Sequence, residues 1–151
     1  MNIYSGGIVN STTINYGEMH IYGGVANYTT VNYGGMTIYS GGTANSTTIN
    51  SGGWMTIYSG ASADHTTNRW GRMYIFSGGI VNNTTVNSAG SMYISSGGIH
   101  RGDLQIESGA IVSAYSGAII DFTLTDRTAE DGYLINDLSL ITGAPTYTIT
   151  V

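Results

Sequence analysis

A six-fold repeat constrains the fold of this chain more than any other feature of its sequence. Segments of the form Met-x-Ile, each followed by an aromatic residue or serine, are spaced 18, 17, 19, 18 and 19 residues apart, and they open at Met1, Met19, Met36, Met55, Met73 and Met92. A repeat of this length is one supersecondary unit, which buries its apolar face only by stacking on its neighbours. The chain is therefore predicted to be a solenoid.

Each unit continues with signals of short strands and tight turns. A glycine pair follows the opening in most units, then come two small or β-branched residues, the block Thr-Thr-(Ile/Val)-Asn, and a second turn with glycine. β-branched and aromatic runs separated by glycine indicate strands and exclude helical repeats. The sequence thus predicts an all-β fold, a single-stranded parallel β-helix of about six to seven coils stacked ~4.8 Å apart.

The alternation of side chains along a strand assigns the two faces of each coil. Methionine and isoleucine of the opening are expected to point inward, as are the first threonine and the Ile/Val of the Thr-Thr block. The aromatic residues after each opening then form an outward row, namely Tyr4, Tyr22, Tyr39, Tyr58 and Phe76. Two further outward rows are Thr13, Thr30, Thr48 and Thr85, and Asn15, Asn32, Asn50 and Asn87. Such rows stabilise adjacent coils, and together they are the predicted interaction surface.

The repeat pattern fails near residue 110, which divides the chain into two regions. Residues 1–110 are predicted to form the repeats, with coils starting near residues 1, 19, 36, 55, 73 and 92. A solenoid needs an atypical terminal unit to cover its strand edges, so residues 111–151 are predicted to be the last coil and a C-terminal β cap. No comparable cap precedes the repeats, so this end is expected to continue a longer array or to meet a partner.

Composition excludes several classes of function. The chain has no lysine and four arginines against nine carboxylates, for a net charge of −5, so no basic surface for nucleic acid is present. It has no cysteine for a disulfide or a thiolate metal site. His20, His65 and His100 recur at no common register, so neither a metal nor a cofactor is expected. No apolar run predicts membrane insertion, and any export signal is expected to lie outside this chain.

The unit at residues 23–42, GGVANYTTVNYGGMTIYSGG, resembles the strand-loop-strand repeats of AIDA-type autotransporter passengers. The resemblance extends over residues 1 to about 110. It implies a right-handed β-helix on the bacterial surface, with a structural or adhesive function in self-association, biofilm formation or attachment. The partners it implies are another copy of the chain, host or bacterial surface glycans, and a glycosyltransferase, since several members are glycosylated on Ser or Thr. The candidate acceptors at the turns are Ser5, Ser40, Ser59, Ser77 and Ser96.

The coil at residues 55–72 departs from the repeat and supports an alternative function. Its irregular residues are Asp64, His65, Arg69, Trp70 and Arg72. Deviations from a regular pattern can mark a functional site, here that of a carbohydrate-binding or carbohydrate-active β-helix. Ordinary drift is the favoured explanation, with Arg69 or Arg72 paired to Asp64 and Trp70 as a surface aromatic residue.

Two short motifs have simpler explanations than function. Residues 101–103 spell Arg-Gly-Asp, an integrin-type attachment tripeptide, in an expected turn between strands, and such a tripeptide often arises by chance. N-glycosylation acceptor patterns begin at Asn10, Asn27, Asn45, Asn82 and Asn83. Because these asparagines share one position of the repeat, a turn-forming role explains them equally well.

An enzyme is not predicted. Glycan cleavage on a β-helix needs carboxylates, or a base with a cation, gathered on one face. Only two pairs of acids have roughly the spacing of one coil, namely Asp103 with Asp121 and Glu107 with Asp126. Arg101 and Arg127 lie close in sequence to these acids, so salt bridges are the simpler interpretation.

Overall fold

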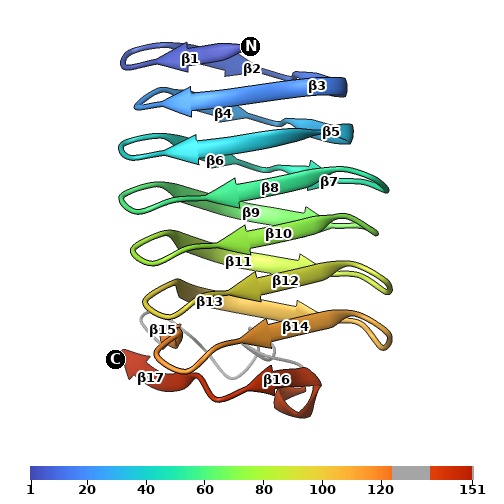
Figure 1. Cartoon of the computed structure of the whole chain (residues 1–151), viewed down its shortest axis with the longest axis vertical. Helices are drawn as coiled ribbons and strands as arrows, with labels where there is room; N and C mark the ends of the chain where they lie inside the picture. The colour runs from blue at the N-terminus through green and yellow to red at the C-terminus, as the bar shows by residue number, and fades with distance from the viewer. Residues whose placement is uncertain (124–136, 151) are drawn as a thin grey trace.

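The chain folds as a flat stack of coils, each of which pairs in parallel with the next (Figure 1). The structure is a computed structural model, and it describes residues 1–123 and 137–150. Its described strands join into one 17-stranded sheet that wraps around the stack. The predicted all-β parallel β-helix is therefore confirmed.

Two rows of strands form the two faces of the stack. The row that faces the viewer in Figure 1 consists of β1 (Asn2–Tyr4), the ends of β3 (Thr13–Tyr22) and β5 (Thr30–Tyr39), β8 (Trp54–Ile57), β10 (Arg72–Ile75), β12 (Ser91–Ile94), β14 (Ile111–Ala114) and β16 (Ile141–Gly143). We call it the front face.

The opposite row, the back face, completes each coil. It consists of β2 (Ile8–Asn10), the beginnings of β3 and β5, β4 (Val25–Asn27), β6 (Thr43–Asn45), β7 (Thr48–Ile49), β9 (Ser62–Asn68), β11 (Ile80–Val86), β13 (Ile99–Ile106), β15 (Ile119–Thr123) and β17 (Thr146–Thr150).

The methionines set the register of the front face. Met36 pairs with Met19 and Met55, and Met73 pairs with Met55 and Met92. The same column continues below the last methionine, because Val112 pairs with Met92 and Ile141 with Val112. The stacking of coils thus extends past residue 110 through β14 to β17. Part of the expected cap, including Asp126 and Arg127, lies outside the described residues.

The interior is filled by the side chains that alternation assigned to it. Met19, Ile21 and their equivalents in the next coils are fully buried, and so are the Val and Ile residues of most Thr-Thr blocks. The small residues of the back face, Ala26, Ala44 and Ala63, fill the column opposite them. Met1 is the exception at 55% exposure, because the first coil has a neighbouring coil on one side only.

Left-handed residues bend each coil at fixed places. Glycine occupies this conformation in the turn at the left of Figure 1, as at Gly60 with φ +73°, where L side chains are strained. A second row of left-handed residues kinks the back face between the Asn and the Thr-Thr block, at Ser11, Tyr28, Ser46, His65 and Asn83, with φ between 49° and 55°. The middle residue of the patterns that begin at Asn10, Asn27, Asn45 and Asn82 is therefore a corner of the coil.

A 3₁₀ turn, η1 (Leu138–Leu140), precedes β16. The carboxylate of Asp137 caps it by accepting from the backbone N–H and hydroxyl of Ser139 at 2.9 and 2.6 Å, and these bonds lower the pKa of Asp137. No helix among the described residues has the length and apolarity needed to cross a membrane.

Candidate interaction surfaces

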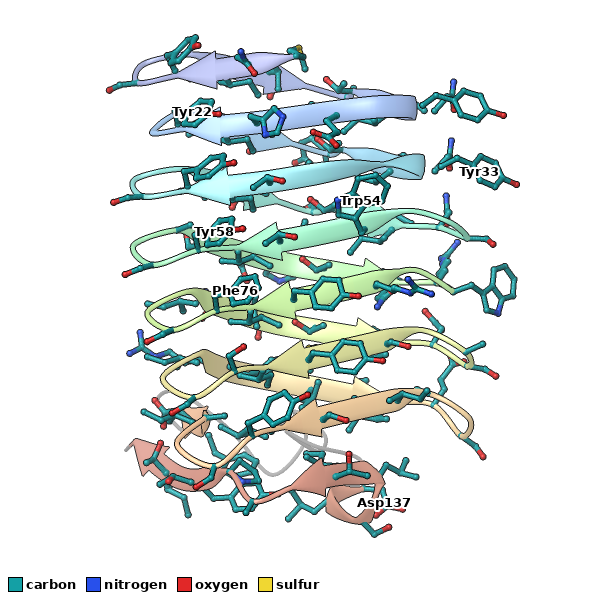
Figure 2. All side chains as sticks on the ribbon, in the orientation of Figure 1. Tyr22, Tyr33, Trp54, Tyr58, Phe76 and Asp137 are labelled. Atoms are coloured by element: carbon teal, nitrogen blue, oxygen red, sulfur yellow. The ribbon has the colours of Figure 1, made fainter. Side chains whose placement is uncertain are left out.

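The predicted aromatic row is a continuous stack on the front face. Successive rings from Tyr4 to Phe76 lie nearly parallel, with centroids 5.5, 4.6, 5.3 and 5.1 Å apart. Four of the five side chains are exposed and Tyr39 is half-buried. Desolvation and the neighbouring phenol of Tyr22 raise the pKa of Tyr39. Figure 2 shows Tyr22, Tyr58 and Phe76 one above another along the edge of the stack.

Two further pairs of stacked tyrosines lie outside the predicted row. Tyr74 and Tyr93 stack at 5.4 Å beside the predicted row. Tyr16 and Tyr33 stack at 5.7 Å on the opposite turn. These pairs could have been found in the sequence, because each joins equivalent positions of adjacent repeats.

The predicted Thr and Asn rows lie on the back face. Thr13 is exposed and the three other threonines are half-buried. The Nδ2 of Asn32 donates to the Oδ1 of Asn15 at 2.7 Å, and the Nδ2 of Asn50 donates to the Oδ1 of Asn32 at 2.9 Å. Arg69 interrupts the row, and Asn87 bonds instead to the carboxylate of Glu107.

A second asparagine row runs along the back face at the glycosylation acceptor patterns. Asn27 donates to Asn10 and Asn45 donates to Asn27, both at 2.9 Å. Asp64 follows in register, and it accepts from the Nδ2 of Asn83 at 3.0 Å. The amide nitrogens of Asn27 and Asn45 are therefore engaged in bonds between coils.

The candidate serines lie in a row on the glycine turns, and all five are exposed. Each hydroxyl from Ser40 onward sits over the left-handed glycine of the next coil. A Cβ on Gly60 would come within 2.7 Å of the Oγ of Ser40, and one on Gly78 within 2.5 Å of the Oγ of Ser59. The missing side chain of each glycine thus makes the space that the serine of the preceding coil occupies.

The residues of the irregular coil do not all converge on one site. Asp64 and His65 lie at the kink of the back face, where His65 Nδ1 is 3.0 Å from the Asp64 carboxylate. Arg69 and Trp70 lie in the turn after β9, and Arg72 opens β10 on the front face. The expected pairing of Asp64 with Arg69 or Arg72 is wrong, because the kink turns the Asp64 side chain toward His65 and Asn83.

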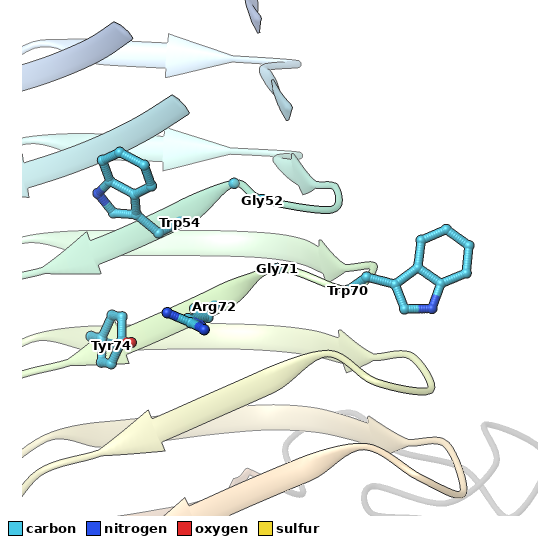
Figure 3. A pocket seen from close by; sticks show the side chains of 7 residues that line it. Gly52, Trp54, Trp70, Gly71, Arg72 and Tyr74 are labelled. Carbon is cyan, nitrogen blue, oxygen red and sulfur yellow. The ribbon is translucent and has the colours of Figure 1, made fainter. Parts of the chain in front are cut away.

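A recess opens on the front face beside Trp70. Three glycines form part of its lining, together with Trp54, Trp70, Arg72 and Tyr74 (Figure 3). Its volume is about 430 Å³. Figure 3 shows the indole of Trp70 projecting outward from the turn, away from the side chains of Trp54, Arg72 and Tyr74, which lie on the neighbouring strands.

Buried Asn68 fixes the turn that carries Trp70. It occupies the inward position that Ile49 and Val86 hold in the adjacent coils. Its Oδ1 accepts from Gly71 N at 3.0 Å, and its Nδ2 donates to the backbone oxygen of Ser91 at 2.7 Å. Asn68 is therefore inside, and its hydrogen bonds tie the turn before β10 to β12, the next strand of the front face.

The Arg-Gly-Asp motif lies within β13 at the kink of the back face, with Gly102 at φ +69°, and does not form a protruding loop. The Arg101 side chain lies 3.7 Å from the Asp121 carboxylate, as expected for a salt bridge. The carboxylate of Glu107 accepts from Ser88 N at 3.0 Å, so it closes a turn. Within residues 1–123 and 137–150, no three His, Cys, Asp or Glu side chains gather in a way that could hold a metal.

His100 is the most unusual buried side chain of the described region. It points inward in the column between Val81 and Ile120, and neither ring nitrogen has a hydrogen-bond partner among the described residues. Burial lowers the pKa of His100 to about 3. The imidazole is therefore neutral near pH 7, so it acts there as a core residue and not as a charged site.

Comparisons with known proteins agree with this architecture. The family model described as the adhesin of the bacterial autotransporter system, probable stalk, matches residues 10–72. A crystal structure of a TibA fragment (residues 55–350 of that protein), hyper-glycosylated by TibC, is 32% identical with a TM-score of 0.68. The match covers 81% of this chain and 58% of the TibA fragment, so the chain spans little more than half of that structure. No curated protein matches the chain.

Proposed function

Since this chain carries the repeats of AIDA-type autotransporter passengers, we propose that it is a stalk segment of a bacterial surface adhesin that acts by self-association outside the cell. The observation that carries the proposal is the row from Tyr4 to Phe76, which places five stacked rings along one edge of the front face. Contiguous exposed apolar surface of this kind marks interaction sites in soluble proteins. No catalytic role is proposed.

The proposed partner is a second copy of the chain. Aromatic side chains with few rotatable bonds lose little conformational entropy on binding, so a rigid row of them suits a large, flat contact. The hydroxyl groups at the tips of the tyrosines supply hydrogen bonds at the rim of such a contact.

Sedimentation velocity over a wide concentration range tests self-association. The double variant Tyr22→Thr with Tyr58→Thr removes two rings from the row. The control, Tyr16→Thr with Tyr28→Thr, removes two exposed tyrosines that lie elsewhere. We expect the native chain and the control to associate as concentration rises and the row variant to stay monomeric. A native chain that sediments as a monomer throughout would overturn the proposal.

We also infer that the serine row of the glycine turns accepts sugars. The TibA fragment, which shares this fold, is hyper-glycosylated by TibC, and the five serines here are exposed at the edge of the stack. Intact-mass spectra after coexpression with TibC are expected to show sugar-sized increments. These increments should be lost when all five serines of the row are changed to alanine, and kept in the control Ser51→Ala with Ser88→Ala. Equal increments in both variants would assign the sugars to other residues.

A further inference from the structure

We propose that the recess beside Trp70 binds an acidic sugar residue of a polysaccharide, with the Arg72 guanidinium holding the carboxylate and aromatic rings contacting the sugar ring. The site goes beyond self-association and does not depend on it. It lies toward the turn after β9, whereas the row from Tyr4 to Phe76 follows the opposite edge of the front face (Figure 2).

Arg72 gives the recess its charge. Its side chain is exposed and takes part in none of the three ion pairs of the described residues. The lining contains no carboxylate, although the chain as a whole carries a net charge of −5. A planar guanidinium binds a carboxylate through two parallel hydrogen bonds. Because no carboxylate of the protein lines the recess, an anionic ligand is expected to supply this partner.

The aromatic walls of the recess are held in place. The ring of Trp54 lies over Gly35 of the preceding coil, so closely that a Cβ on Gly35 would fall 2.3 Å from its Cε2 atom. Tyr74 is fixed by its stack with Tyr93. Rigid aromatic side chains around a few polar groups are the usual lining of a ligand site, and the faces of such rings accommodate the apolar faces of sugars.

Trp70 is the bulkiest left-handed residue in its row of turns. Its φ is +64°, whereas the other left-handed residues in this row of turns are Gly17, Gly52, Ala89 and Gly109. The side chain is nevertheless 61% exposed and gains little from burial. A bulky residue in this conformation costs free energy that glycine would not, so Trp70 departs from the glycine that occupies most of these turns.

Asn68 is a second departure from the repeat at the same turn. An aliphatic side chain fills its position in the neighbouring coils, yet here a buried amide bonds to Gly71 and Ser91. The result is a turn held in one geometry, with Trp70 at its tip and Arg72 at its end. Local departures from the repeat that together organise one recess are what a binding site requires.

Titration of trigalacturonate into the monomeric chain, followed by calorimetry and tryptophan fluorescence, tests the site. Galactotriose serves as the neutral match. We expect trigalacturonate to bind with an affinity that falls as salt rises, and galactotriose to bind at least about tenfold more weakly. Arg72→Gln should weaken trigalacturonate binding about tenfold or more. Arg69→Gln removes the same charge from the same turn but does not line the recess, so it should change affinity less than about twofold.

Sialyllactose and a heparin tetrasaccharide extend the test to other acidic sugars. The proposal is overturned if none of the three acidic probes binds, if galactotriose binds as tightly as trigalacturonate, or if Arg69→Gln and Arg72→Gln weaken binding equally. Sedimentation of the same samples separates the two proposals, because a monomer that binds acidic sugar supports this site whatever becomes of self-association.

Discussion

Asn32 donates its side-chain amide to Asn15 in the preceding coil and accepts the amide of Asn50 from the following one, at 2.7 and 2.9 Å. Asn27 does the same between Asn10 and Asn45 on the same face. Each central asparagine therefore joins three coils through one side chain. Such amide ladders are also found where identical strands stack in fibrils.

Replacing Asn32 tests how much a ladder contributes to stability. Asn32→Ala removes two hydrogen bonds, so we expect the free energy of unfolding to fall by about 1–3 kcal/mol. Asn50→Ala removes one bond at the end of the ladder and should cost about half as much. Urea denaturation followed by circular dichroism gives both values. Equal losses in the two variants would mean that the ladder bonds do not add.

A column of buried threonines predicts a stabilising substitution. The hydroxyls of Thr29, Thr47, Thr66 and Thr84 are buried and have no hydrogen-bond partner among the described residues. Valine has nearly the same shape without the unsatisfied hydroxyl, so Thr47→Val should raise the free energy of unfolding by about 1 kcal/mol. The matched change on the outward side, Thr48→Val, should have little effect. A lower melting temperature for Thr47→Val would contradict the buried, unpaired hydroxyl.

Buried His100 predicts a loss of stability in acid. The pKa of His100 is about 3 in the folded chain and near 6.5 in the unfolded chain. Between these two pH values the imidazole is protonated in the unfolded state and neutral in the folded state. Stability is therefore retained above about pH 6.5 and falls by on the order of a few kcal/mol as the pH drops toward 3.

The variant His100→Val isolates this contribution, since the side chain then matches Val81 in the column above. Urea denaturation of both proteins between pH 7 and pH 4 should show a steeper decline for the native chain. Parallel curves would indicate that His100 is not the group responsible.

Trp70→Gly should make the chain more stable. Glycine adopts φ +64° without strain, and the exposed indole gives up little contact, so we expect a gain of about 1 kcal/mol in the free energy of unfolding. Ala89→Gly relieves a left-handed residue with a small side chain and should gain less. Thermal unfolding by calorimetry distinguishes the two. Destabilisation by Trp70→Gly would show that the indole makes contacts that outweigh its strain.

Much of this structure follows from the repeat alone. The spacing of the methionines gave the register, because residues one coil apart must stack when every strand is parallel. Alternation then placed the tyrosines outward and the isoleucines inward, as the ring stacks and the buried core confirm. The periodic pattern alone is enough to predict the register and the faces, because each coil contacts only the coils next to it.

What the pattern could not supply depends on single residues. The dipeptide Ile99-His100 does not by itself indicate that the histidine faces inward, because apolarity alone would place the isoleucine in the core. The orientation follows from the column in which His100 pairs with Val81 and Ile120. The Asn-x-Thr pattern does not reveal whether the asparagine side-chain amide is free or hydrogen-bonded to the next coil. The recess beside Trp70 needs a left-handed backbone and a buried amide at Asn68, and both arise from the three-dimensional turn.

The parallel pairing of successive coils also determines how the stack yields to a pulling force. Backbone hydrogen bonds between coils point along the long axis, so tension applied across the two ends falls on the bonds of one terminal coil at a time. A coil of 17 to 19 residues that peels away adds up to about 60 Å of extended chain. A stalk built in this way lengthens coil by coil under shear and leaves the remaining coils folded.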